Sequence, residues 1–144
     1  MSIEELLQRE ETAWSRLTDA LAAVPPERRD VEGVVPGWSV HDVAWHCVYW
    51  AGDAGEVLER ILGGDPDPPE SDVPDEEILA TGRAMGWNEI LGHAERGRER
   101  VRAAFSAFAD PPPKALELFG DETFDHYEEH EAQIRAFSAQ LLRG

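Results

Sequence analysis

Two of the five histidines, His126 and His130, lie four residues apart in the segment DHYEEHEAQI. In a helix this spacing places both imidazoles on one side, one turn apart, where both could reach a single ion. Ile134, Phe137 and Leu141 continue along that side, so the pair belongs to the face that is directed towards the core. Because buried imidazoles need polar partners, the pattern indicates either a metal ion or hydrogen-bonded core histidines.

A third histidine, His46, lies at the edge of an apolar stripe that includes Val43 and Trp50. Three imidazoles converging from two helices would form a facial set of ligands and leave other coordination positions open for water or a substrate atom. That arrangement is typical of a catalytic site rather than a closed structural one. By chance, roughly one in seven chains of this length with five histidines would contain such a pair, so spacing alone leaves both alternatives open.

The other two histidines, His41 and His93, stay outside the predicted ligand set. His41 falls in the first turn of a helix, where we expect it to be solvated. His93 lies at the border of the apolar face of a later helix, which makes it a poor fourth ligand.

The chain must position these residues with helices, because its apolar residues recur at steps of three and four. Pro25-Pro26 ends the first helix, and Ser39 with Asp42 forms a capping box at the start of the second, which stops at Gly63-Gly64. No segment alternates as a strand would. The pattern predicts an all-α, four-helix bundle in one domain, 1–144, with helices over about 3–23, 39–62, 75–108 and 121–142.

The third predicted helix contains four glycines, Gly82, Gly86, Gly92 and Gly97. Each interior glycine costs about 1 kcal/mol relative to alanine, so these positions could permit a break. Alternatively, Gly86 and Gly97 fall on the inward face, where missing side chains could leave room for a pocket. After this helix, Pro111-Pro112-Pro113 predicts an extended linker, and Asp121 could cap the last helix.

The composition excludes several classes of protein. A formal net charge of -17 repels phosphate backbones and anionic membranes, so we expect neither nucleic acid nor a membrane surface as a partner. The acidic N-terminus does not resemble a signal peptide, and a single cysteine, Cys47, allows no intramolecular disulfide. Both observations favour a cytoplasmic protein.

Two motifs resemble the DinB-like proteins over nearly the whole chain. PGWSVHDVAWHCVYWAGD is similar to the family's Gly-Trp-Ser opening of its second helix, followed by a metal-binding histidine, here His46. ETFDHYEEHEAQI is similar to the family's His-x-x-x-His, here His126 and His130. The resemblance implies a four-helix bundle of the DinB type that holds one divalent metal ion, Zn²⁺ or Ni²⁺, on these three histidines. It also implies pairing into homodimers through helix faces, for which Trp14 or Trp87 could serve if they are not core residues.

The family includes transferases and isomerases that use bacillithiol or mycothiol, so the resemblance implies a thiol-dependent enzyme that acts on a small molecule. Alternatives are a metal-dependent hydrolase or ring-opening protective enzyme, and a non-catalytic metal-binding stress protein. The mycothiol-dependent maleylpyruvate isomerases carry glutamate at the position of His126 and an additional C-terminal domain; we expect neither here and do not transfer that specific activity to this chain. Cys47 stands where leucine is usual, and we interpret it as a buried apolar substitute rather than a nucleophile.

Three further residues are candidates for roles near the ion. Asp53 lies two turns after His46 on nearly the same side, where it could orient a ligand or shuttle a proton; a solvated surface carboxylate is the simpler interpretation. Tyr49 and Trp50 could form a wall of the substrate pocket, although Trp50 could equally pack in the core.

Overall fold

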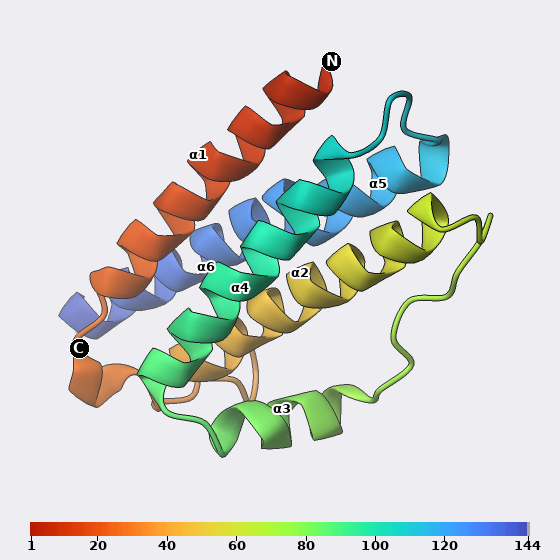
Figure 1. Ribbon diagram of the computed structural model, residues 1–144. Coiled ribbons are helices and arrows are strands. Elements are labelled where there is room, and N and C mark those ends of the chain that lie inside the picture. The colour runs from red at the N-terminus through yellow and green to blue at the C-terminus, as the bar shows by residue number, and fades with distance from the viewer. Residues whose placement is uncertain (144) are drawn as a thin grey trace.

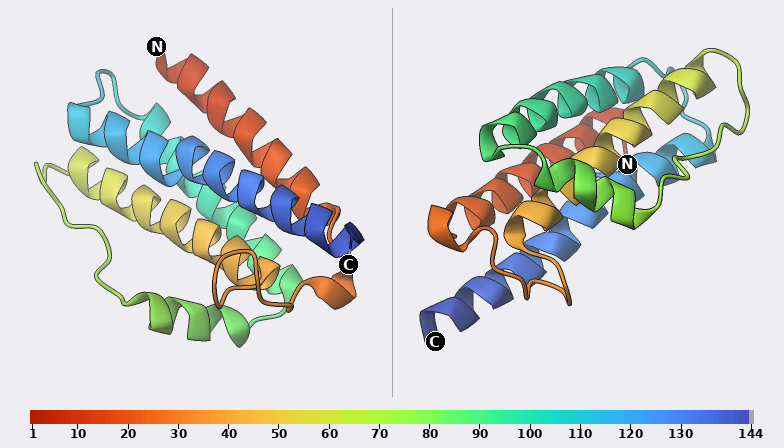
Figure 2. Two further views of the ribbon diagram at one scale, coloured as in Figure 1. Left: turned by 180° about the vertical axis from the view of Figure 1, so that it is seen from behind. Right: turned by 90° about the horizontal axis from the view of Figure 1, so that it is seen from below.

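The computed structural model describes residues 1–143 and consists of helices joined by loops. Four rods run side by side in Figures 1 and 2: α1, α2, α4, and a last rod formed by α5 and α6 in succession. The shorter helix α3 lies across one end of the bundle. The helices are α1 (Ile3–Ala22), η1 (Pro26–Arg28), α2 (Val40–Leu62), α3 (Asp75–Arg83), α4 (Trp87–Ser106), α5 (Pro113–Glu122) and α6 (Phe124–Arg143). The predicted all-α bundle is confirmed.

Helix α2 is the centre of the bundle, and its predicted start is confirmed. The Ser39 hydroxyl accepts the Asp42 N–H at 3.2 Å while the Asp42 carboxylate accepts the Ser39 N–H at 2.9 Å, which completes the capping box. Arg83 of α3 donates to the same carboxylate at 3.0 Å, so the cap also fixes α3. The helix ends at Gly63, as predicted.

Helices α2 and α4 approach closely at Gly55. A Cβ atom on Gly55 would lie 3.2 Å from the backbone N and Cα of Val101, tighter than an ordinary contact. The absence of a side chain at this position lets the two backbones touch.

The prediction of one helix over 75–108 is wrong, because the segment is broken into α3 and α4. The break lies at Ala84–Gly86, where Gly86 becomes the N-cap of α4 and its N–H is directed at the Glu89 carboxylate, 3.5 Å away. The break lets α3 turn onto α2 (Figure 1). There it packs so closely that a Cβ on Gly82 would lie 2.4 Å from Cδ1 of Trp45.

The last rod also differs from the prediction. The predicted extended linker Pro111-Pro112-Pro113 ends at Pro112, because Pro113 is the first residue of α5. At that position the backbone N–H makes no hydrogen bond within the helix, so a proline is tolerated. The rod is interrupted at Thr123, with φ -119° and ψ -97°, so Asp121 lies inside α5 and does not cap the last helix. The interruption lets the Phe124 ring lie over Gly120, where a Cβ would come within 2.9 Å of the ring.

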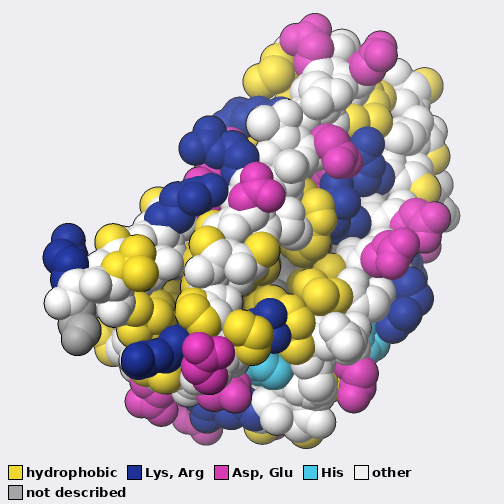
Figure 3. Space-filling view, turned by 90° about the vertical axis from the view of Figure 1, so that its left-hand side faces the viewer, with side chains coloured by type: hydrophobic (Ala, Val, Ile, Leu, Met, Phe, Trp, Pro, Cys, Tyr) yellow, Lys and Arg dark blue, Asp and Glu magenta, His cyan; other side chains and the backbone are white. Residues whose placement is uncertain are grey.

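Ion pairs link α1 to its neighbours. The Glu10 carboxylate is fully buried and accepts from Arg98 and Arg102 of α4, each at 2.7 Å. Acidic and basic side chains are interspersed over the face in Figure 3, and hydrophobic side chains gather around its middle. Among residues 1–143, none of the helices combines the length and apolar character that crossing a bilayer requires.

Candidate metal centre

Three imidazoles converge between α2 and α6. Nε2 of His126 lies 2.9 Å from Nε2 of His46 and 3.0 Å from Nε2 of His130, so His126 stands between the other two. The rings meet edge to face, with centroids 4.6–5.1 Å apart. His130 is 7% exposed, and the other two are partly exposed, so the cluster lies at the border of the core and reaches solvent on one side. Together these side chains could hold a metal ion.

The helices fix this geometry locally. The four-residue spacing of His126 and His130 places both rings on one side of α6, which begins directly after the interruption at Thr123. His46 projects from α2 towards them, and the Trp38 ring packs edge-on against His46 with centroids 4.9 Å apart. The two predicted helices therefore bring the three histidines together, as the sequence indicated.

The Nδ1 atoms of the three rings, which lie on the side away from the Nε2 cluster, differ in their hydrogen bonds. Nδ1 of His130 lies 2.7 Å from Oε1 of Gln133, an acceptor that requires Nδ1 to carry the proton and leaves Nε2 with its lone pair. Nδ1 of His46 and Nδ1 of His126 are buried without a hydrogen-bond partner in the described part of the chain. Sequence reasoning missed Gln133, although its place one turn after His130 was a signal that could have found it.

The environment keeps two of the imidazoles neutral. Burial, followed by the neighbouring His130, lowers the pKa of His46 to about 4, against a smaller opposite effect of Asp75. Burial, together with His130 and His46, lowers the pKa of His126 to about 3. At neutral pH both rings are therefore uncharged, which is the form that can donate a lone pair to a metal ion.

These shifts predict how the metal-free protein responds to acid. Because the pKa values of His46 and His126 in the folded state lie below the ordinary 6.5, the unfolded chain binds more protons between about pH 6.5 and 3. Their contribution to the free energy of unfolding is present above pH 6.5 and is lost as the pH falls through that window. Urea unfolding of metal-free protein at pH 7.5, 6 and 5 measures it.

A variant isolates the histidine contribution from that of the acidic residues. Burial raises the pKa of Glu122 to about 7, so its effect runs in the opposite direction, with stability present at low pH and lost as the pH rises towards 7. Wild type and the double variant His46→Gln, His126→Gln both contain Glu122. Its effect therefore cancels when the free energy of unfolding of the variant is subtracted from that of the wild type. That difference should shrink on acidification, and a constant difference from pH 7.5 to 5 would contradict the prediction.

The structure places the two other histidines and the cysteine outside the cluster. The expectation that His41 is solvated is wrong, because its Nε2 lies 2.8 Å from the Gly82 carbonyl oxygen and its ring is half-buried against α3. His93 is exposed on α4 and lies beside Trp45, with centroids 5.5 Å apart, so it is directed away from the three histidines. Cys47 is fully buried, and burial raises the pKa of its thiol far above the ordinary value, which confirms an apolar role.

Asp53 and Tyr49 hold the loop that joins α2 to α3. The Asp53 carboxylate is half-buried and accepts the Ser71 N–H at 3.0 Å, while the Tyr49 hydroxyl lies 2.5 Å from the Ser71 hydroxyl. Asp53 is therefore an anchor for this loop rather than a solvated carboxylate. Trp50 is half-buried against the core and packs edge-on to Tyr49 at 5.2 Å. Sequence reasoning missed Ser71, which contacts α2 only through the folding of the loop.

Comparison with known proteins agrees with this architecture. Residues 9–134 match the DinB superfamily. The structure is similar to the crystal structure of an uncharacterised protein from Escherichia coli UTI89, with a TM-score of 0.79 and 16% sequence identity over 96% of this chain and 94% of that one. This likeness extends to the fold alone. No significant match was found among curated proteins. Since the family match covers most of the sequence, the chain belongs to the DinB superfamily.

Proposed function

We propose that the protein is a metal-dependent enzyme in which His46, His126 and His130 hold one divalent ion, Zn²⁺ or Ni²⁺. Its reaction is the transfer or isomerisation of a small molecule with the help of a low-molecular-weight thiol. The observation that carries the proposal is the convergence of three imidazole nitrogens at 2.9 and 3.0 Å. Membership of the DinB superfamily supports the same assignment.

The donor set fits such an ion. Imidazole nitrogens are common ligands of Zn²⁺ and Ni²⁺, and the three candidate ligand atoms all lie within 4.8 Å of one another. Among residues 1–143, the three Nε2 atoms have only each other as hydrogen-bond partners. The lowered pKa values of His46 and His126 exclude the protonated forms at neutral pH, so these rings are ready to coordinate.

A bound divalent ion would supply Lewis acidity and favour the thiolate form of a coordinated thiol. The residues of the chain provide solvent access to the ion and orient its ligands. Three protein ligands would leave other coordination positions for a thiol or water, and the partial exposure of His46 and His126 gives the cluster access to solvent. Gln133 keeps the proton of His130 on Nδ1 and so directs the lone pair of Nε2 into the cluster.

Cobalt substitution tests the thiol dependence. Protein loaded with Co²⁺ should change its visible absorption when bacillithiol, mycothiol or glutathione is added, because a thiolate bound to the ion gives a charge-transfer band. The His130→Ala variant, treated in the same way, is the control and should show no band. If the loaded wild type gives no spectral change with any of the three thiols, the thiol part of the proposal fails while the metal part remains.

Gln133 should matter for metal affinity. Replacement of Gln133 with leucine removes the acceptor that orients His130, and loss of such a partner typically weakens metal binding by about 10- to 100-fold. Competition with a chromophoric chelator measures the dissociation constant. The matched control is Gln140→Leu, the same change at an exposed position of α6. An unchanged constant in Gln133→Leu would exclude the orienting role.

A further inference from the structure

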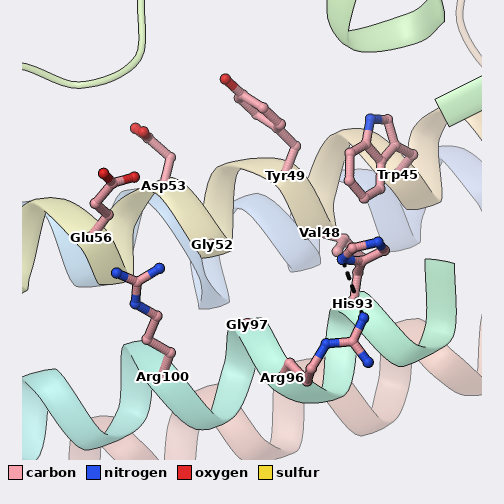
Figure 4. Close-up of a pocket in the computed structure, with 10 residues that line it drawn as sticks. All are labelled: Trp45, Val48, Tyr49, Gly52, Asp53, Glu56, His93, Arg96, Gly97 and Arg100. Carbon is pink, nitrogen blue, oxygen red and sulfur yellow. Dashed lines mark hydrogen bonds between the residues drawn. The ribbon is translucent and has the colours of Figure 1, made fainter. Parts of the chain in front are cut away.

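A cavity lies between α2 and α4, away from the three clustered histidines. Its volume is about 340 Å³, and Figure 4 shows the residues that surround it. Trp45, Val48 and Tyr49 line one end, and the glycines Gly52 and Gly97 form its floor. None of the three clustered histidines lines it.

Facing glycines create the hollow. A Cβ atom on Gly52 would meet nothing within 4 Å, so the space above this residue is open. A Cβ on Gly97 would lie 3.7 Å from the Cα of Gly52, an ordinary contact distance. The helices are therefore close here, and the missing side chains leave a pocket. This is the outcome that the sequence left open for Gly97.

The α4 wall of the cavity carries an arginine that pairs with no carboxylate among residues 1–143. Four arginines follow one another at every second position of α4, and three of them pair with carboxylates: Arg98 and Arg102 with Glu10, and Arg100 with Glu59 at 2.5 Å. Arg96 lies within 4.0 Å of no carboxylate oxygen in the described part of the chain. Its only side-chain partner there is Nδ1 of His93, at 3.4 Å (Figure 4).

The opposite wall is acidic, and its carboxylates already have partners. Asp53 accepts the Ser71 N–H, and Glu56 accepts from Arg60 at 3.1 Å. These two groups repel a second negative charge in the cavity without competing for Arg96. The cavity therefore suits a ligand with a single negative charge, bound from the α4 side.

The aromatic end accepts an apolar group. The Trp45 indole N–H donates to the Ile78 carbonyl oxygen at 2.9 Å, and the Tyr49 hydroxyl is engaged with Ser71. With their polar atoms used, both side chains present carbon surface to the cavity, next to Val48. A ring or short hydrocarbon can pack there while a charged group reaches the α4 wall.

We propose that this cavity binds a small monocarboxylate with an aromatic or apolar body. The carboxylate is held by Arg96, with His93 beside it, and the body lies over Gly52 and Gly97 against Trp45 and Tyr49. A guanidinium suits this task because it can offer two parallel N–H donors to a carboxylate. The site is separate from the three-histidine cluster, and its occupation does not depend on a metal ion.

A titration followed by ¹H–¹⁵N NMR of the purified protein tests the site, with the amides of Gly52 and Gly97 as reporters. Phenylacetate should shift both resonances saturably. Phenylacetamide, which lacks the charge, and phenylmalonate, which carries two charges, should each bind about tenfold more weakly or worse. Equal binding of phenylacetamide, the absence of saturable shifts with phenylacetate, or shifts centred on His126 instead of the glycines would overturn the proposal.

Two variants locate the binding determinants. Arg96→Gln removes the unpaired charge from an exposed residue and should weaken phenylacetate binding about tenfold or more. Gly52→Leu fills open space in a helix and should abolish the shift at Gly97. Arg28→Gln, which removes the same charge from the exposed η1 turn, should bind as the wild type does. If Arg96→Gln binds phenylacetate as tightly as Arg28→Gln, the site is excluded, even if Gly52→Leu fails to fold.

Discussion

Replacement of His130 with alanine should abolish stoichiometric metal binding. His130 is the most buried of the three clustered histidines and the one with a hydrogen-bonded outer nitrogen, so its loss leaves two ligands and a cavity. Elemental analysis of dialysed protein should find about one divalent ion per wild-type chain and less than about a tenth of that in the variant. The melting temperature with Zn²⁺ or Ni²⁺ present should fall to the metal-free value, because binding no longer stabilises the folded state.

His93→Ala is the matched control for this experiment. It removes an exposed histidine that lies against Trp45 on the other side of α2, so the metal content should stay at the wild-type level. A folded His130→Ala variant that retained about one ion per chain would end the three-histidine proposal. Circular dichroism on the same samples separates that result from misfolding.

The second large effect is expected at Glu10, far from the candidate metal centre. Glu10→Ala removes a fully buried carboxylate and leaves the guanidinium groups of Arg98 and Arg102 facing each other across a void. Removal of one partner from a buried ion pair typically costs about 3–5 kcal/mol. Urea unfolding of the variant should show a loss of unfolding free energy of this size.

The neighbouring residue offers the control. Glu11 also pairs with Arg98, at 2.9 Å, but its side chain is exposed, so Glu11→Ala should cost only about 0–1 kcal/mol. If both variants lost the same free energy, burial of Glu10 would not be the cause.

The parts of the fold that were predictable are those encoded by neighbouring residues. Helix α2 could be bounded because Ser39 and Asp42 cap it and Gly63 ends it, all within one or two turns of the positions that they affect. The histidine cluster was predictable for a related reason. A four-residue spacing fixes the relative directions of His126 and His130, and the apolar stripe of α2 indicates where His46 points.

The parts that were missed depend on contacts between distant segments. The break before α4 lets α3 pack on Trp45 through Gly82, a contact that the periodicity of 75–108 cannot reveal. The role of Asp53 depends on Ser71, which comes back to α2 only through the folded loop. His41 was expected in solvent because the Gly82 carbonyl that contacts it lies 41 residues away.

The backbone contact at Gly55 has a consequence for how the groove between α2 and α4 can evolve. The separation of these helices is set there by main-chain atoms of Val101, which cannot adopt a new rotamer as a side chain would. One turn away, Gly52 faces open space and tolerates larger residues. Selection can therefore reshape what the groove accepts, residue by residue, on a scaffold whose width stays constant.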